Sequence, residues 1–182
     1  MKKVFIAAFC IMGNLSLSFA NDKLRPEVNK DEYTLASGYR GFVDFGYTAG
    51  TGTYSLGRVS LLTSHGYQFN PYIFMGAGLG INYYHETASA NVPVFTHLKG
   101  TFMKGRIVPF AELKIGYALA EVTGFYMNPS VGCRMGINKR IGFNFCLGYE
   151  VQQTELYFYN DQTSFYSDKN LGGFSFKVGI DF

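Results

Sequence analysis

The polar segment that starts at residue 85 holds three side chains with catalytic potential. His85 can act as a base, Ser89 as a nucleophile and Glu86 as the group that orients the base. All three lie in one five-residue stretch, and no other segment offers them a partner. We therefore expect a solvated loop here, with no catalytic residue and no enzymatic activity in the chain.

Two other histidines and two glycine runs could suggest ligand sites. We expect His65 at a strand end and His97 in the interior near Lys99, and neither has metal-ligand spacing to another His or Cys. The runs GAGLG (76–80) and AGTGTY (49–54) do not open a helix, as a phosphate-binding loop does. We assign them to strands and turns, and we predict no metal and no cofactor.

The N-terminus predicts a cleaved secretory signal peptide over residues 1–20. A basic KK start is followed by an apolar stretch over 4–17 and by SFA at 18–20, which suits signal peptidase. A transmembrane anchor is one alternative, but Asn14 and Ser16 interrupt the apolar stretch. A lipoprotein site at Cys10 is another, but Phe9 is too bulky to precede it. Removal of the two lysines lowers the net charge from +3 to +1, so nothing indicates a nucleic-acid partner.

The rest of the chain predicts an all-β fold in one domain. After a polar stub over 21–36, which we place in the periplasm, alternating runs fill residues 37–182 without a sustained helical period. The turns NP (70–71), KGR (104–106) and NKR (138–140) are tight, and the other links are mostly longer, as in outer-membrane barrels. We expect a transmembrane antiparallel up-and-down β-barrel of about eight strands, at 38–48, 54–69, 71–84, 92–103, 107–119, 125–137, 141–157 and 171–182.

Alternation does not by itself say which face is outside, but glycine does. Glycine falls on the polar row of strand after strand, where it weakens a soluble surface but leaves room in a narrow barrel interior. We therefore place the polar row inside. Its charges must pair there, and the interior should be plugged. The expected polar network comprises Arg40, Asp44, Arg58, Lys99, Glu112, Lys114, Arg134, Glu150, Lys177 and Asp181.

The apolar row would then face lipid, with aromatic residues near the strand ends. Tyrosine suits a membrane boundary because its ring is apolar and its hydroxyl is polar. A soluble β-sandwich with core tyrosines is the alternative. The expected interfacial residues are Tyr39, Tyr47, Tyr83, Tyr117 and Tyr149.

Two cysteines of the predicted barrel should stay unpaired. If residues 138–140 join two strands whose apolar rows both face lipid, Cys133 points outward and Cys146 points inward. Side chains on opposite faces of a sheet cannot reach disulfide geometry.

The segments GYRGFVDFGY, HGYQFNPYIFMGAGLGINYY and NPSVGCRMGINKRIGFNFCLGYE, with the terminal aromatic, resemble the small outer-membrane β-barrel proteins of Gram-negative bacteria. This family, often labelled porin-like, includes eight-stranded barrels of the OmpA and OmpX kind. The resemblance implies an outer-membrane location, contact with membrane lipid, and insertion by the barrel assembly machinery. In such families that machinery recognises an alternating C-terminal strand, represented here by Phe174, Phe176, Val178, Ile180 and Phe182.

For function we expect a structural or surface-interaction protein, in which outer loops contact any extracellular ligand. Exposed aromatics in the longest expected loop, 158–170, could bind a partner, although we favour their resting on the barrel rim. A narrow channel for ions or very small solutes is the main alternative. A lipid-modifying enzyme that uses His85 and a soluble ligand-binding barrel are weaker ones. The loop aromatics are Phe158, Tyr159, Phe165 and Tyr166.

Overall fold

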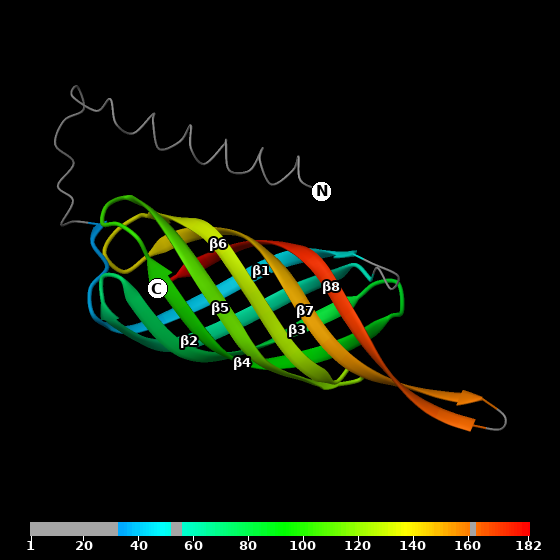
Figure 1. Ribbon diagram of the computed structural model, residues 1–182. Helices are drawn as coiled ribbons and strands as arrows, with labels where there is room; N and C mark the ends of the chain where they lie inside the picture. Colours follow the sequence, from blue (N-terminus) through cyan, green and yellow to red (C-terminus); the bar gives the residue numbers. More distant parts are fainter. Residues whose placement is uncertain (1–32, 52–55, 161–162) are drawn as a thin grey trace.

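The computed structural model describes residues 33–51, 56–160 and 163–182, with the backbone alone for 154–160 and 163–170. The predicted signal peptide and the stub as far as residue 32 lie outside these ranges. The described residues form one closed barrel of eight strands (Figure 1). The strands are β1 (Gly38–Thr51), β2 (Arg58–Asn70), β3 (Ile73–Tyr84), β4 (Ser89–Thr101), β5 (Ile107–Ala120), β6 (Gly124–Gly136), β7 (Gly142–Asn160) and β8 (Thr163–Asp181).

Each strand pairs antiparallel with the next in sequence, and β8 closes onto β1. The closing register runs from Phe42↔Asp181 to Thr51↔Gly172. Two backbone hydrogen bonds extend it, from Gly41 N to Phe182 O at 2.8 Å and from Phe182 N to Gly41 O at 3.0 Å. The all-β class, the eight strands and the up-and-down topology are confirmed. Closure leaves no open sheet edge in the barrel wall, which is the condition for a sheet to cross lipid.

The end of the barrel that holds Gly38 and Phe182 is called the terminal end below. It carries the three predicted turns, and two of them are fixed by asparagine. The side-chain Oδ1 of Asn70 accepts hydrogen bonds from the backbone N–H of Tyr72 and Ile73, at 2.8 and 3.0 Å. Asn138 does the same for Arg140 and Ile141. This local bonding explains why the sequence located these turns correctly.

The opposite end is called the hairpin end, and the expectation of longer links there is wrong for the β3–β4 and β5–β6 links. The β3–β4 link spans only 85–88 and the β5–β6 link only 121–123, no longer than the 102–106 and 137–141 links of the terminal end. Backbone pairing continues as far as Tyr84↔Ser89 and Asn91↔Ala120. Residues 89–91 therefore belong to β4, because ladder pairing satisfies their backbone groups.

The predicted longest loop is also strand in its described residues, 158–160 and 163–170. In Figure 1, β7 and β8 project together past the hairpin end. The last pairs with the barrel are Tyr126↔Gln152 on one side and Thr51↔Gly172 on the other. Beyond them, residues 153–160 pair with 163–170 alone, from Gln153↔Asn170 onward. We call this two-stranded segment the β7–β8 ribbon. The backbones of the four aromatics predicted in a loop lie within it, and their side chains are outside the described residues.

The barrel has an apolar exterior and a polar interior. In β7 the side chains of Phe143, Phe145 and Leu147 are exposed, whereas those of Asn144 and Cys146 are buried. The predicted assignment of faces is therefore correct. Among the described residues, no helix is long and apolar enough to cross a membrane.

Aromatic side chains are exposed near both ends of the barrel. All five predicted interfacial tyrosines point outward, and four of them lie toward the hairpin end. A second set at the terminal end was not predicted as a group, because its members come from turns and strand ends far apart in sequence. It comprises Tyr39, Tyr67, Phe69, Tyr72, Phe102 and Phe182.

Candidate functional site in the barrel interior

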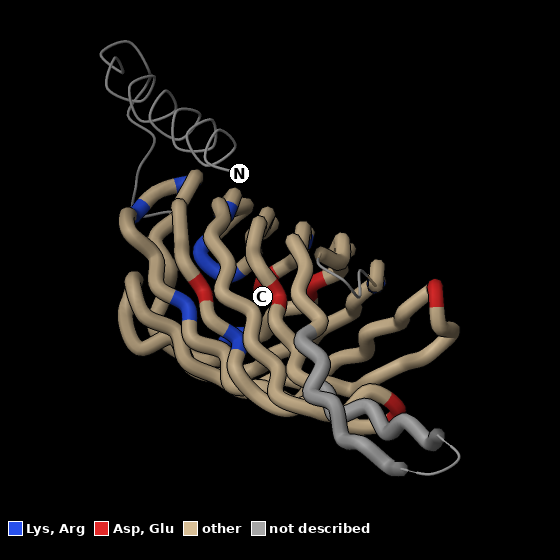
Figure 2. Tube along the Cα trace, turned by 45° about the vertical axis from the view of Figure 1, so that its right-hand side comes forward, with Lys and Arg blue, Asp and Glu red and all other residues tan. Residues whose placement is uncertain are grey.

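The ten charged residues of the expected polar network all lie inside the barrel, each less than a tenth exposed. They come from seven strands, and Figure 2 shows charged positions distributed along the wall. Six are Lys or Arg and four are Asp or Glu, so the interior carries two excess positive charges with His97 neutral. Buried charges are tolerated only when paired and hydrogen-bonded, so their partners decide what the interior can do.

The group nearest the terminal end is built around one carboxylate. Asp181 of β8 accepts hydrogen bonds from Arg134 Nε, at 2.9 and 3.0 Å, and pairs with Arg40 of β1. Asn144 Nδ2 donates to Asp181 at 2.8 Å and its Oδ1 accepts from Lys99 Nζ at 2.7 Å. Asp181 therefore pairs directly with two cations and is connected to a third, Lys99, through Asn144.

Lys99 also lies against aromatic rings. Its ammonium is 3.6 Å from the ring centroid of Phe110 and 4.6 Å from that of Phe42. A cation over a ring face is attracted by the ring quadrupole, and the attraction is stronger when water is excluded. The rings partly compensate a charge that no carboxylate contacts directly.

The middle group contains an arrangement that the sequence did not suggest. Ser64 Oγ lies 2.8 Å from His97 Nδ1, and His97 Nε2 lies 3.2 Å from Glu112 Oε2. Lys114 donates to Glu112 at 3.0 Å and to Asp44 at 2.7 Å. A serine, a histidine and a carboxylate in series occur in nucleophilic catalysis.

This Ser64–His97–Glu112 series is sealed from any substrate. His97 has no exposed surface, and its ring packs edge-on against Phe42 and Phe74, each at 5.2 Å between centroids. A nucleophile must reach a substrate to act, and these side chains cannot. We therefore assign them a structural role, as hydrogen-bond partners inside the barrel. The sequence placed His97 inside but missed Ser64, because a lone serine in a strand carries no spacing signal.

The group toward the hairpin end centres on Glu150 of β7. It accepts a hydrogen bond from Arg58 Nε at 2.6 Å and lies 3.8 Å from Lys177 Nζ. Lys177 donates to Asn128 Oδ1 at 2.6 Å. The guanidinium of Arg58 also lies 5.5 Å from the ring centroid of Tyr84.

Several buried polar atoms near this group have no hydrogen-bond partner among the described residues. They are contiguous across β1 to β4, because Thr48 pairs with Arg58 and Asn82 pairs with both Ser60 and Asn91. Buried polar atoms are normally satisfied by protein or by water. This patch is therefore the part of the interior most suited to hydration. The atoms are Thr48 Oγ1, Arg58 Nη1 and Nη2, Ser60 Oγ, both amide atoms of Asn82, and Asn91 Oδ1.

The first catalytic candidate of the sequence, His85 with Glu86 and Ser89, does not form a catalytic arrangement. Ser89 begins β4 and donates to the carbonyl of Thr87 at 3.3 Å. The ring of His85 stacks on that of Tyr47, at 6.3 Å between centroids, and its Nε2 is 3.7 Å from Glu86. Across the described part of the chain, no three His, Cys, Asp or Glu side chains gather as metal ligands.

His65 was predicted at a strand end, and that prediction is wrong. It lies within β2 on the outer face, because β2 pairs with both neighbours well beyond it. Its ring nitrogens lie 2.6 Å from Tyr39 Oη and 3.0 Å from Thr63 Oγ1. The ring also packs edge-on against Phe182.

The two cysteines occupy the predicted faces. Cys133 is exposed on β6, and Cys146 is buried on β7. The register pairs Cys133 with Phe145 and places Cys146 opposite Gly132. The two thiols therefore point away from each other across the sheet.

Two solved structures show the same fold. Neisserial surface protein A, from a crystal structure, matches with a TM-score of 0.60 at 12% identity, over 80% of this chain and 97% of that chain. Outer membrane protein AlkL, solved by solid-state NMR in lipid bilayers, matches with a TM-score of 0.53 at 11% identity, over 89% of this chain and 95% of that chain. The predicted resemblance to small outer-membrane barrels is confirmed at the level of fold. No family model and no curated protein matches the sequence.

Proposed function

We propose that this chain is an integral outer-membrane β-barrel protein with a closed interior and a structural or surface-interaction role. One observation carries the proposal: large apolar side chains cover the outside while ten charged side chains are buried inside. A soluble barrel has the opposite polarity, because water stabilises exposed charge and disfavours exposed apolar surface. Lipid reverses both preferences.

In this proposal the N-terminal signal directs export, and the barrel assembly machinery inserts the chain with its terminal end toward the periplasm. The outward row of β8, from Phe174 to Phe182, is the segment that this machinery would recognise. Outer-membrane lipid is then the partner of the apolar exterior, whose aromatic ends suit the two membrane boundaries.

The packing of the interior supports a closed barrel. An added Cβ at Gly78 would lie 2.6 Å from the ring of Phe95, and one at Gly132 would lie 2.8 Å from the ring of Phe110. Large rings therefore fill the space that the glycines leave, and the ion pairs described above occupy much of the rest. An eight-stranded barrel is in general just wide enough for side chains to fill it.

The β7–β8 ribbon supports the surface role. It extends beyond the rest of the barrel, and each of its strands has one edge without a neighbouring strand. Two-stranded ribbons are marginally stable in water on their own, so contact with a partner surface would stabilise this one. We also propose that the protein is not an enzyme, since the Ser64–His97–Glu112 series is buried and the hydroxyl of Ser89 donates to the carbonyl of Thr87.

Heat-modifiable mobility on a detergent gel tests the barrel. An unheated sample that migrates differently from a boiled one supports a closed membrane barrel, and recovery of the protein in the soluble periplasmic fraction without detergent would contradict it. Conductance in planar bilayers then tests closure. Currents no larger than background are expected.

A narrow channel remains the second candidate, favoured by the patch of unpartnered polar atoms near Arg58. Water that reaches this patch would hydrate the part of the interior that β1 to β4 line near Arg58. Steady single-channel currents that change on Arg58→Gln substitution would support the channel over the closed barrel.

A further inference from the structure

We propose that the terminal end of the interior contains a binding site for one small monovalent anion of the size of chloride. The site is a cavity lined by the three cations around Asp181, and it goes beyond the structural role proposed above. Its lining comprises Leu35, Arg40, Phe42, Gln68, Phe74, Lys99, Thr101 and Arg134.

Charge is the first argument. Arg40 and Arg134 both pair with Asp181, and Lys99 reaches Asp181 only through Asn144. Glu112 is opposite Lys99 in the β4–β5 register, but it contacts Lys114 and His97 and does not line the cavity. The cavity lining therefore contains three cations and no carboxylate. Uncompensated buried charge is costly, and an anion in the cavity would offset part of this charge.

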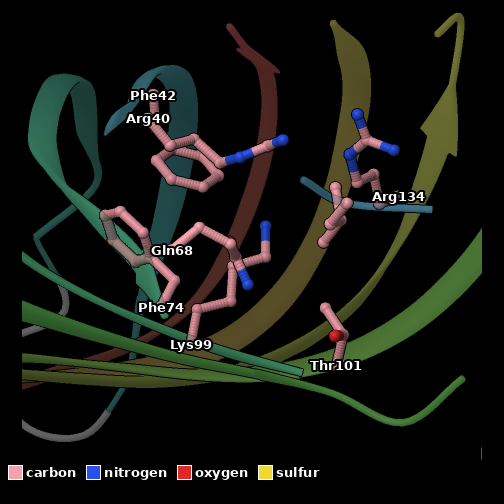
Figure 3. Close-up of a pocket in the computed structure, with 8 residues that line it drawn as sticks. Arg40, Phe42, Gln68, Phe74, Lys99, Thr101 and Arg134 are labelled. Atoms are coloured by element: carbon pink, nitrogen blue, oxygen red, sulfur yellow. The ribbon is translucent and has the colours of Figure 1, made fainter. Parts of the chain in front are cut away.

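Free donors are the second argument. Arg134 is 1% exposed, and its Nη1 has no hydrogen-bond partner among the described residues. Lys99 Nζ donates to Asn144 and otherwise faces aromatic rings, which cannot satisfy all of its N–H groups. Figure 3 shows Arg40, Gln68 and Lys99 extending toward one space, with Arg134 across it. Gln68 Nε2 already donates to the carbonyl of Asn70 and Arg40 Nη2 to that of Lys139, so the free donors are those of Arg134 and Lys99.

Size and wall chemistry limit the occupant to one small species. The cavity has a volume of about 10 Å³, close to the space for a single water molecule. Phe42, Phe74 and Leu35 supply apolar walls, which suit a weakly hydrated halide better than a polyatomic anion such as sulfate.

Two glycines make room for the guanidinium that would hold the anion. Gly136 and Gly142 are opposite each other in the β6–β7 register. A Cβ at Gly142 would lie 2.7 Å from Arg134 Cζ, and a Cβ at Gly136 would lie 2.8 Å from Arg134 Nη1. An alanine at residue 142 would therefore move the guanidinium without changing any charge.

Chloride-35 NMR line broadening on the full chain folded into detergent micelles tests the proposal, with gel mobility used to verify folding of each variant. We expect saturable broadening that bromide competes away and sulfate does not. Lys99→Met should weaken chloride binding about tenfold, since it removes a charged donor. Gly142→Ala should also weaken chloride binding. It replaces Lys99→Met as the test variant if Lys99→Met does not fold.

Lys177→Met is the matched control, because it removes a buried lysine near Glu150, away from the cavity. It should leave chloride binding within about twofold of the native value. Absence of saturable broadening in the native barrel would overturn the proposal, as would an equal loss in Lys177→Met or equal competition by sulfate. Halide binding in micelles does not require membrane insertion, so the result is separate from the test of the proposed function.

Discussion

At the scale of single residues, Asp181 carries the ionic bonding of the terminal end. Its two oxygens serve both Arg40 and Arg134, and Asn144 connects it to Lys99. Replacement by asparagine would leave two buried guanidinium groups without a carboxylate. Because breaking a buried pair typically costs about 3–5 kcal/mol, we expect Asp181→Asn to lower the free energy of unfolding by that amount.

Urea unfolding of the barrel in lipid vesicles measures this loss. Glu86→Gln is the matched control, because Glu86 is about half exposed and should change the free energy of unfolding by less than about 0.5 kcal/mol. Equal effects of the two substitutions would contradict the central role of Asp181.

Strand glycines differ in how closely other atoms approach them: Gly78 of β3 lies on the inward row, and Gly100 of β4 lies on the outward row. A Cβ at Gly78 would lie 2.4 Å from the carbonyl oxygen of Thr63, whereas the nearest atom to a Cβ at Gly100 is 4.0 Å away. Gly78→Ala should therefore destabilise the barrel by about 1–3 kcal/mol through overpacking. Gly100→Ala should be neutral or slightly stabilising, by less than about 1 kcal/mol. The same urea titration compares them, and a Gly78→Ala variant as stable as Gly100→Ala would show that the interior is loosely packed.

The two thiols test which side chains of β6 and β7 face lipid and which face the interior. In protein that is denatured but not reduced, both Cys133 and Cys146 should react with a maleimide, because neither is in a disulfide. In the barrel inserted in vesicles, a membrane-impermeant maleimide should label neither, since Cys133 faces lipid and Cys146 is buried. Single serine variants assign each signal, and an unreactive denatured sample would indicate that the thiols are paired.

At the scale of elements, the β7–β8 ribbon is separable from the barrel. Residues 153–160 pair only with 163–170. Their removal therefore leaves the backbone pairing of the other strands unchanged. We expect a variant in which Asn-Gly replaces 153–170 to retain heat-modifiable mobility, because this turn closes a two-residue hairpin. Limited proteolysis of the native protein should cut first within the ribbon.

The control for this variant is an equivalent shortening of the β3–β4 hairpin. Tyr84 and Asn91 in that hairpin hydrogen-bond to Gln152 inside the barrel. Removing 84–91 should lower the yield of folded barrel. Loss of folding in the ribbon variant instead would mean that the ribbon belongs to the folding unit.

At the scale of the whole molecule, closure depends on how β8 meets β1. Phe182 makes the last two backbone hydrogen bonds of that seam with Gly41. If Phe182 is also the residue that the assembly machinery recognises, its deletion should lower the amount of inserted barrel far more than the stability of barrel already inserted. Membrane fractionation measures the first quantity and urea unfolding the second.

Phe102→Ala is the control for this deletion, because Phe102 is another exposed aromatic of the terminal end but not the C-terminus. It should insert at close to the native level. Equal amounts of inserted native protein and deletion variant would refute the role of Phe182 in recognition.

The sequence by itself determined the strands, their faces and the residues inside. A strand turns successive side chains to opposite faces, so Cys133 and Cys146 could be placed from their neighbours alone. The same period put the ten charged residues in the interior, and local asparagine bonding located the terminal-end turns.

Only the tertiary structure decided which interior residues meet and where the strands stop. Asp181 contacts Arg40, which is 141 residues away, and Arg134, which is 47 residues away, because barrel closure and register bring three strands to one point. Ser64 meets His97 for the same reason. The links at the hairpin end and the β7–β8 ribbon were mispredicted because a strand continues for as long as a neighbour satisfies its backbone groups. That depends on the partner strand as much as on the residues themselves.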